Sequence, residues 1–542
     1  MRPQHLPTRT DLPTMLMHWG LVIALLLSVS TGWRIASMTD SSALLRWVDA
    51  LLLQGNVLRW HFMSAAVLTA LVVAYIVFLW RMDLGGRLTL RLASLKSHDR
   101  ATRWQAINKL IYWIAFALLA GAAVTGVLMY FLPGLLPTDP LATVHQWLSW
   151  GFVVYMGLHV MAQVIMGGVR QLLKIVTPRA AYGLGAAFAL VAGLGGAAFA
   201  YVLDSSSQPV LTFVKTSALP VLDGDGNDDA WKQAPESVVH TARGFNLDGG
   251  EVDVHIRALH DGTRAYLLFR WQDATRSQKH IPLQKTAGGW KLLHTNYYNN
   301  DENEYYEDKF AVMIAQSPIA GGNTVRLGSK PFADKPGPSN GLGLHAATDG
   351  SLADVWHWKS VRSGAINQFD DNYFGQLMDV NPGRYTGGYT QDPKTGGGFD
   401  QIFEKIADSP YVKVKFLPRD LAAQQSQMGQ FSPDPHVSDM GKFAMARADV
   451  QPYSAEADAA IPVGTVIPSI VYDTPFAGDR GDVSANAQWK DGWWTMEASR
   501  QLDTGSRFDQ PLTNGSYMWV SVFDHNQVRH TRHIQPLRLR LQ

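Results

Sequence analysis

The 542-residue sequence contains no cysteine. This absence excludes disulfide bonds, thiolate metal sites, iron–sulfur clusters and haem attached through thioether bonds. The sequence also has almost no net charge, because 47 Lys and Arg residues nearly balance 46 Asp and Glu residues and leave +1. Proteins that bind nucleic acid through its phosphates usually carry a basic excess, so we expect no nucleic-acid partner.

The apolar residues are concentrated in the first part of the chain. Five apolar runs occupy about residues 15–38, 58–80, 105–132, 142–169 and 182–203. Each run reaches the roughly 20 residues that span a bilayer. The first run is long and lacks a small-residue cleavage site, so we expect a retained membrane anchor and not a signal peptide. The sequence therefore predicts a multi-pass membrane protein whose first part is an all-α helical bundle.

Basic residues are concentrated in alternate loops between these runs. The loop after the second run contains Arg81, Arg87, Arg91, Lys96, Arg100 and Arg103, whereas the loop after the third run contains no Lys or Arg. The positive-inside rule then places the N-terminus in the cytoplasm. Residues after about 204 are expected on the periplasmic side of a bacterial inner membrane.

Two histidines, His145 and His159, lie fourteen positions apart in the fourth run. On a helix they come within about 40° of each other and lie about 21 Å apart along the axis. The predicted topology places His18 level with His159 near the cytoplasmic surface, and His61 level with His145 near the outer surface. Ionisable side chains inside a membrane generally mark functional sites. We therefore predict two haem irons, each bound by two imidazoles from facing helices.

Other interpretations of these histidines remain open. A single membrane histidine can hydrogen-bond across helices, and a zinc site or a proton relay is conceivable for a pair. The 21 Å separation and the scarcity of Asp and Glu in the runs favour haem. Several glycines near these positions would let flat macrocycles approach the helix backbones: Gly20, Gly32, Gly121, Gly126, Gly151 and Gly157. Arg59 is expected to pair with a haem propionate.

The first 180 residues resemble the bacterial di-haem cytochrome b-561 type, which is related to the membrane cytochrome subunits of hydrogenases and thiosulfate reductase. The resemblance is carried by MHWG (17–20), RWHF (59–62), NKLIYW (108–113), TG (125–126), VHQW (144–147) and GLHV (157–160). It implies a four-helix core that binds two b haems and exchanges electrons with quinone. Residues 181–204 contain no histidine and are expected to form a fifth membrane helix that tethers the rest of the chain.

The remaining residues, 205–542, have the alternating pattern of β-strands. Such runs occur at 252–259, 265–271, 310–316 and 517–523, separated by turns rich in Gly, Asn and Asp. We predict an all-β sandwich with long insertions between about 317 and 480. The composition of these insertions favours binding loops over core.

This second part resembles the haem-binding subunit of ethylbenzene dehydrogenase and its relatives. The resemblance is carried by PVLDGDGNDDAWKQA (220–234), LLFRWQD (267–273), YYEDKFAVMI (305–314), ADVWHWKS (353–360) and WKDGWWTMEASRQL (489–502). It implies one haem in a periplasmic β-sandwich. Relatives with covalent haem carry a Cys-x-x-Cys-His motif before the ADVWHW stretch. Here only the histidine, His345, is present, so a non-covalent b haem is expected.

Several residues are candidates for the axial ligands of this haem. Relatives that bind the haem non-covalently use a methionine and a late lysine, and here the late region has histidines instead. We favour His345 with His530, followed by Met313 with His530 or His533. Surface or packing roles remain open for each of them. Five other histidines are expected to have packing or unrelated roles: His255, His260, His280, His294 and His357.

Two further patterns have alternative interpretations. The segment Asp223–Asp229 alternates acidic residues as a calcium loop does, but its twelfth position is Ala234, so a strand-opening turn is favoured. A group of tryptophans either lines a carbohydrate groove or belongs to the core: Trp356, Trp358, Trp489, Trp493 and Trp494.

We therefore predict a membrane b-type cytochrome that relays electrons between quinone and a periplasmic redox protein, reductase or dehydrogenase. Either direction of flow is allowed, and no substrate chemistry within this chain is expected. The alternative from another class is a membrane-anchored ligand-binding or sensor protein, whose β-sandwich binds a carbohydrate or another ligand in place of haem. A homodimer is compatible with both.

Overall fold

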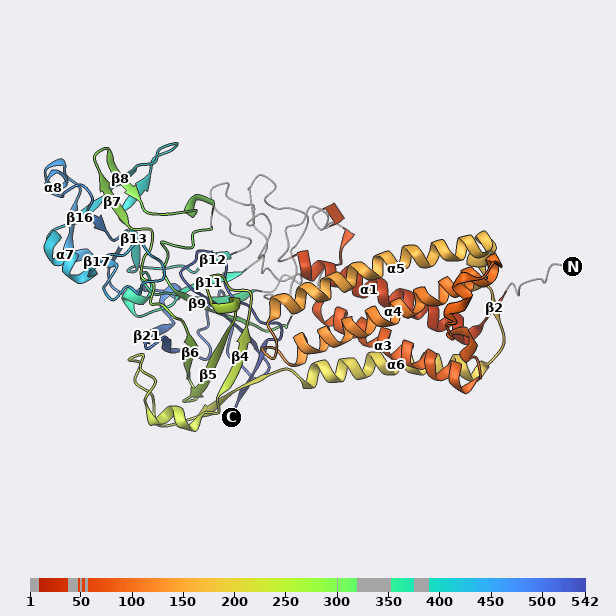
Figure 1. Ribbon diagram of the computed structural model, residues 1–542. Coiled ribbons are helices and arrows are strands. Elements are labelled where there is room, and N and C mark those ends of the chain that lie inside the picture. Colours follow the sequence, from red (N-terminus) through yellow and green to blue (C-terminus); the bar gives the residue numbers. More distant parts are fainter. Residues whose placement is uncertain are drawn as a thin grey trace, which may run out of the picture. The chain divides into compact units, whose positions relative to one another are not determined.

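The computed structural model describes residues 9–37, 47–48, 51–53, 57–299, 301–318, 352–374 and 389–542 (Figure 1). The chain forms two compact units, Met1–Ser207 and Gln208–Gln542. The first unit is helical and the second is rich in β-strands. Both parts of the predicted fold class are therefore confirmed.

Five helices of the first unit run side by side (Figure 1). They are α1 (Leu12–Ser37), α3 (Val57–Arg81), α4 (Arg100–Phe131), α5 (Thr138–Leu173) and α6 (Gly183–Ser206). Within the described residues, these five are long and apolar enough to cross a membrane. The side chain of Asp99 caps α4 by accepting a hydrogen bond from the backbone N–H of Thr102. Near its end α5 departs from helical geometry at Gly168, whose φ of 61° favours glycine.

The helix α6 packs into the bundle, although the sequence indicated only a tether. A Cβ atom on Gly196 would lie 2.7 Å from the Cβ of Ala70, so glycine allows α6 and α3 to approach closely. In the last turn of α6, Asp204 accepts a hydrogen bond from Nε of Arg59 at 2.7 Å and another from the hydroxyl of Tyr130. Asp204 therefore links α6 to both α3 and α4.

The second unit is built on a 12-stranded sheet, in which β4 (Ser237–Thr241) pairs with β5 outside the main path. The strand order is β12 (Tyr389–Gln391), β11 (Asp370–Phe374), β10 (Ala353–Lys359), β9 (Lys309–Ala315), β23 (Tyr517–Phe523), β24 (Leu537–Leu541), β3 (Val210–Lys215), β5 (Val252–His260), β6 (Arg264–Gln272), β22 (Trp493–Gln501) and β21 (Ser484–Lys490).

The two halves of this sheet face each other across one core. Trp271 on β6 stacks on Phe310 of β9 with ring centroids 4.7 Å apart, and it lies 6.2 Å from Trp494 on β22. Because β6 and β9 are far apart in the strand order, the sheet must curl back over itself. The sandwich is thus formed by a single curled sheet.

The segment 399–472 of the insertions builds a second hydrophobic core together with residues 281–306, so the prediction of mainly binding loops is wrong for this part. Ile281, Trp290, Phe403 and Met445 are buried together. Around them lie β7 (Leu283–Thr286), β8 (Gly289–Leu292), β14 (Phe403–Lys405), β15 (Val412–Val414), β19 (Val466–Ile467), β13 (Phe399–Gln401), β20 (Ile470–Tyr472), β17 (Ala444–Ala446), β16 (Phe416–Pro418), β18 (Val450–Pro452), α7 (Leu421–Met428) and α8 (Ala455–Ala459).

Candidate functional site

The four membrane histidines form two pairs in the helical unit. His18 on α1 faces His159 on α5 with ring centroids 6.3 Å apart. His61 on α3 faces His145 on α5 with ring centroids 6.0 Å apart. These are the same pairs that depth in the membrane predicted from the sequence. After the predicted topology, His18 and His159 are called the inner pair, and His61 and His145 the outer pair.

The spacing of each pair fits one metal ion between the two rings. About 2 Å separates a metal ion from an imidazole nitrogen, and about 1 Å separates that nitrogen from its ring centroid, so rings on opposite sides of one ion have centroids about 6 Å apart. Both observed distances agree with this value. A direct hydrogen bond between two imidazoles would bring the centroids closer. The donor set of two neutral imidazoles is one that haem iron accepts.

The rings of the outer pair are oriented by hydrogen bonds to their Nδ1 atoms. Nδ1 of His61 lies 2.9 Å from the backbone oxygen of Ser28 and 3.2 Å from Oγ1 of Thr31. Nδ1 of His145 lies 2.8 Å from Oγ1 of Thr125. With Nδ1 engaged in this way, Nε2 is the nitrogen left to bind a metal.

The rings of the inner pair are held differently. Nδ1 of His18 and Nδ1 of His159 are buried and have no hydrogen-bond partner in the described part of the chain. The ring of His159 instead packs against Tyr112 and Tyr155, with centroids at 5.4 Å and 5.7 Å. The two pairs therefore differ in their surroundings, although they use the same residue type.

Two of the predicted glycines flank the imidazoles of the outer pair. A Cβ atom on Gly32 would lie 3.0 Å from Cε1 of His61, and one on Gly126 would lie 3.5 Å from Cε1 of His145. A side chain at either position would therefore crowd a ring bound on that side. The other predicted glycines face leucine side chains or open space: Gly20, Gly121, Gly151 and Gly157. Arg59, predicted to pair with a propionate, is bonded to Asp204 and lies over the ring of Tyr201.

A chain of polar side chains, which the sequence analysis missed, lies between α4 and α5 beside the inner pair. Nε2 of Gln171 donates to Gln163 at 3.1 Å, and Nε2 of Gln163 donates to Oδ1 of Asn108 at 2.8 Å. Nδ2 of Asn108 then donates to the hydroxyl of Tyr112 at 2.8 Å. Since Tyr112 packs on His159, this chain ends at the inner pair. The i, i+4 spacing of Asn108 and Tyr112 within an apolar run was the available signal.

The predicted ligands of the β-rich unit have different surroundings. His345 lies outside the described residues. Met313 lies on β9 in an apolar cluster with Val355 and Trp519. The ring of His530 packs against Phe523, with centroids 4.9 Å apart.

His533 uses both ring nitrogens within the fold. Its Nε2 accepts a hydrogen bond from the backbone N–H of Val520 at 3.0 Å, and its Nδ1 lies 2.7 Å from the backbone oxygen of Gln535. Burial lowers the pKa of His533 to about 4, so the ring is neutral at pH 7. This geometry leaves His533 no free nitrogen for an iron.

His357 on β10 has the free nitrogen that His533 lacks, although the sequence analysis assigned it to packing. Its ring stacks on Phe523 at 5.2 Å, and its Nδ1 lies 3.1 Å from the hydroxyl of Tyr389. Its Nε2 is buried and has no partner among the described residues. Burial, reinforced by nearby cations, holds the pKa of His357 well below its ordinary value, so the imidazole is neutral and able to bind a metal.

These residues share one face of the curled sheet. On β10, His357 pairs with Ala311 and Val355 pairs with Met313, so Met313 and His357 are diagonal neighbours on that face. His530 packs on Phe523, the same ring that carries His357. The face therefore brings together a thioether and two imidazoles.

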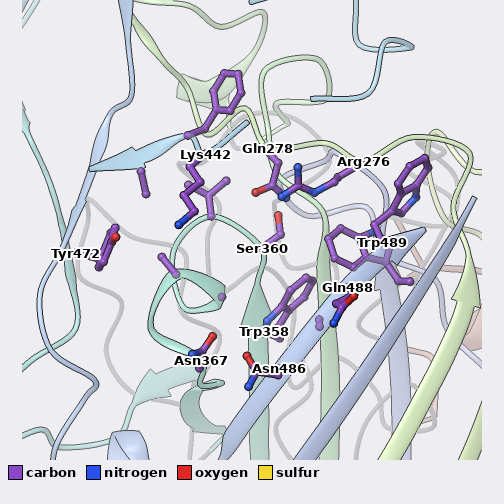
Figure 2. A pocket seen from close by; sticks show the side chains of 17 residues that line it. Arg276, Gln278, Trp358, Ser360, Asn367, Lys442, Tyr472, Asn486, Gln488 and Trp489 are labelled. Atoms are coloured by element: carbon purple, nitrogen blue, oxygen red, sulfur yellow. The ribbon is translucent and has the colours of Figure 1, made fainter. Parts of the chain in front are cut away.

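A pocket of about 480 Å³ lies elsewhere in the β-rich unit (Figure 2). Figure 2 shows Arg276, Gln278, Lys442 and Trp489 around it. Of the predicted tryptophan group, Trp358, Trp489 and Trp494 line this pocket, and Trp358 and Trp494 also belong to the buried core together with Trp356. Trp489 is partly buried and its indole N–H donates to the backbone of Asp273.

The carboxylates of the calcium-like segment cap a turn. Oδ1 of Asp223 accepts from the backbone N–H of Asp225, whose own Oδ1 accepts from Asn227. Oδ2 of Asp228 accepts from Val221. In the described chain, the acidic groups that converge closely enough to hold a metal ion lie elsewhere. These hydrogen bonds support the interpretation of the segment as a strand-opening turn over its interpretation as a calcium loop.

Two family models match this chain. Residues 228–534 match the family described as Ethylbenzene dehydrogenase, and residues 9–178 match the one described as Prokaryotic cytochrome b561. No curated protein matches. Among solved structures, a carbohydrate binding module family 9 from Caldicellulosiruptor kristjanssonii matches in complex with glucose and with cellotriose. The identity is 9%, the coverage is 61% of this chain and 95% or 94% of that chain, and the TM-score is 0.23.

Proposed function

Because this chain belongs to the ethylbenzene dehydrogenase family and carries a prokaryotic cytochrome b561 domain, we propose that it relays electrons between membrane quinone and a periplasmic redox partner. The cytochrome b561 domain identifies a membrane b-type cytochrome of electron transfer. The observation that carries the finer proposal is the pair of facing imidazoles at each of two places, spaced for one iron each.

In this proposal His18 and His159 hold one haem, and His61 and His145 hold the other. A haem bound in this way accepts and releases one electron. The continuous helix between His145 and His159 sets the two sites about 21 Å apart along the axis of α5. The four histidines orient the two haems, and the apolar helices around them exclude water.

The inner pair is assigned to the cytoplasmic end of the bundle. Arg87, one of the six basic residues between the second and third apolar runs, forms an ion pair with Asp11 just before α1 at 2.9 Å. His18 follows Asp11 within two helical turns, so the basic loop and the inner pair share one end of the bundle. The positive-inside rule makes this the cytoplasmic end and directs α6 outward.

The polar chain beside His159 is the proposed place of quinone exchange. Oxidation of a quinol releases two electrons and two protons, so its site needs hydrogen-bonding groups near an electron acceptor. Asn108, Tyr112 and Gln163 supply such groups within a segment where water is scarce. Gln171 extends these hydrogen bonds towards the end of α5.

Replacing Gln163 with leucine should slow haem reduction by a quinol about tenfold, because a lost hydrogen bond to the bound quinol is worth about 1.5 kcal/mol. The measurement is stopped-flow absorbance of the purified protein, with total haem taken from the dithionite-reduced spectrum. Gln146→Leu is the matched control, since it makes the same change on α5 beside the outer pair. Equal slowing in both variants would contradict a quinone site at Gln163.

We extend the proposal to a third haem in the β-rich unit. The face that carries Met313, His357 and His530 is its place, and His357 supplies a buried neutral nitrogen. This haem would connect the membrane haems with a soluble periplasmic protein.

The test is the number of haems per chain, measured by pyridine haemochrome on the full-length protein in detergent. Three b haems are expected, and the double variant His18→Ala/His61→Ala should retain the third. Two haems in the unaltered protein would confine the relay to the membrane.

A ligand-binding function is the second candidate, favoured by the polar and aromatic pocket of Figure 2. In that case the full-length protein contains two haems and binds an oligosaccharide. Trp489→Ala should then abolish binding, because a partly buried indole in a pocket wall is a typical platform for a sugar ring.

A further inference from the structure

Five aspartates of the β-rich unit converge near the edge of the large sheet that is formed by β10, β11 and β12. Asp354 lies on β10, Asp371 on β11 and Asp392 directly after β12. Asp482 follows the short helix η11 (Asp479–Gly481), and Asp509 lies between β22 and β23. Asp354, Asp371 and Asp509 each present an oxygen within 4.8 Å of the others. Five separate segments thus deliver carboxylates to one place.

The positive charge at this place is insufficient for five carboxylates. Arg500 is buried and forms an ion pair with Asp354. Arg480 lies two positions before Asp482 in the sequence, but it forms its ion pair with Asp370, which is outside the cluster. Within the described residues, Arg500 is therefore the cation paired with the cluster, and it can balance only one of the five carboxylates when all five are ionised.

Asp392 provides a separate observation that points to a ligand. It is only 3% exposed, and neither of its carboxylate oxygens has a hydrogen-bond partner in the described chain. The charges that act on it most strongly are those of Asp509 and Asp354, so its side chain faces the cluster. A buried carboxylate without a partner is costly unless a cation or a proton compensates it.

Other carboxylate oxygens of the cluster also lack a hydrogen-bond partner in the described part of the chain. The atoms without a partner among the described residues are Oδ1 of Asp354, Oδ2 of Asp371, both oxygens of Asp482 and Oδ1 of Asp509. The remaining oxygens of Asp371 and Asp509 accept hydrogen bonds from the backbone of Asn372 and the hydroxyl of Thr504. Each carboxylate therefore has at least one oxygen available for a cation.

We infer that Asp354, Asp371, Asp392, Asp482 and Asp509 form a calcium-binding site. A set made only of carboxylate oxygens selects hard cations and disfavours zinc, copper or iron. Calcium accepts six to eight oxygens in a flexible geometry, which suits carboxylates from five segments, whereas magnesium requires a strict octahedron and retains water. The bound ion would fasten β10, β11 and β12 to the segments after η11 and β22.

The second buried acidic group of this unit consists of Asp308, Asp524 and His525, and its carboxylates have hydrogen-bond partners within the fold. Asp308 accepts hydrogen bonds from the backbone N–H groups of Ser277 at 2.7 Å and His525 at 3.1 Å. The carboxylate of Asp524 bonds to the ring of His525. This group therefore has compensating partners, which the five-aspartate cluster lacks.

The test uses full-length protein in detergent, depleted with EGTA and then given calcium. Bound calcium is measured by mass spectrometry after gel filtration, and thermal unfolding of the β-rich unit is followed by tryptophan fluorescence. At least one calcium per chain is expected, and at 100 times Kd the Tm should rise by about 4 °C. Asp392→Asn and Asp482→Asn should each reduce retention at least tenfold. Asp225→Asn, in the turn near the start of the unit, is the matched control and should retain calcium.

The Asp392→Asn variant also tests the site without calcium. In EGTA it should unfold at a higher temperature than the unaltered protein, because it removes one of the repelling charges, whereas in calcium it should unfold at a lower one. No retained calcium together with equal Tm values in EGTA and calcium would overturn the inference, as would calcium loss in Asp225→Asn alone. Tighter retention of magnesium than of calcium would overturn the assignment to calcium. The haem count tests the proposed function separately.

Discussion

The variant His159→Ala is expected to lose the inner membrane haem and keep the outer one. His159 faces His18, whereas His145 and His61 form their own pair about 21 Å away along α5. An alanine removes one of the two imidazoles that would hold the haem at one site and leaves the other site intact. Haem content should fall from three to two per chain, and reduction by quinol should fall at least 100-fold because the inner site adjoins the polar chain.

The counterpart His145→Ala should lose the outer haem and keep reduction of the inner haem by quinol. Pyridine haemochrome gives the haem content of both variants, and a redox titration shows which component has disappeared. His98→Ala, in the loop between α3 and α4, is the control for replacing a histidine outside the pairs. Retention of both membrane haems in His159→Ala would refute the pairing. Loss of both, with helicity by circular dichroism unchanged, would refute the independence of the two sites.

The variant His357→Ala is expected to lose the haem of the β-rich unit. Nε2 of His357 is buried without a partner among the described residues, and the ring is fixed by Phe523 and Tyr389. The membrane haems should remain and should still be reduced by quinol. Electron transfer to a soluble acceptor should fall at least 100-fold, because the outer end of the relay is gone.

His533→Ala is the matched control for this experiment. His533 is buried in the same unit, but its nitrogens bond to the backbone of Val520 and Gln535, so its loss should lower stability and leave the haem in place. Met313→Leu conserves volume and should remove the third haem only if the methionine sulfur is the opposite ligand. Three haems in His357→Ala would exclude His357 as a ligand.

The membrane pairs could be predicted because helix geometry and bilayer thickness leave little freedom. Fourteen residues fix both the rotation and the rise between His145 and His159, and the alternating basic loops set the depth of His18 and His61. The four positions therefore followed from the sequence with their partners. Whether they bind haem stays a prediction for the experiments above.

The features of the β-rich unit could not be predicted in the same way. Asp354 and Asp509 are 155 positions apart, and strand order and loop paths decide that they meet. The acidic segment that did stand out, Asp223–Asp229, forms a local turn because each carboxylate finds a backbone N–H nearby. The second core was missed because its strands have only two to four residues, too few to show a period.

The separation of the two histidine pairs along α5 also has an electrical consequence. About 21 Å of a hydrocarbon core of about 30 Å means that an electron passing from one pair to the other crosses about two thirds of the insulating layer. Moving one electron across the whole layer against a membrane potential of 100 mV changes its free energy by about 2.3 kcal/mol. The step between the two pairs covers about two thirds of the layer, so its free energy changes by about 1.5 kcal/mol. With the cytoplasm negative and the proposed orientation, that voltage favours outward electron flow about tenfold at equilibrium and opposes the reverse equally. If the proposed haems and orientation hold, the transfer between the two sites would be electrogenic, and its direction would respond to the membrane potential.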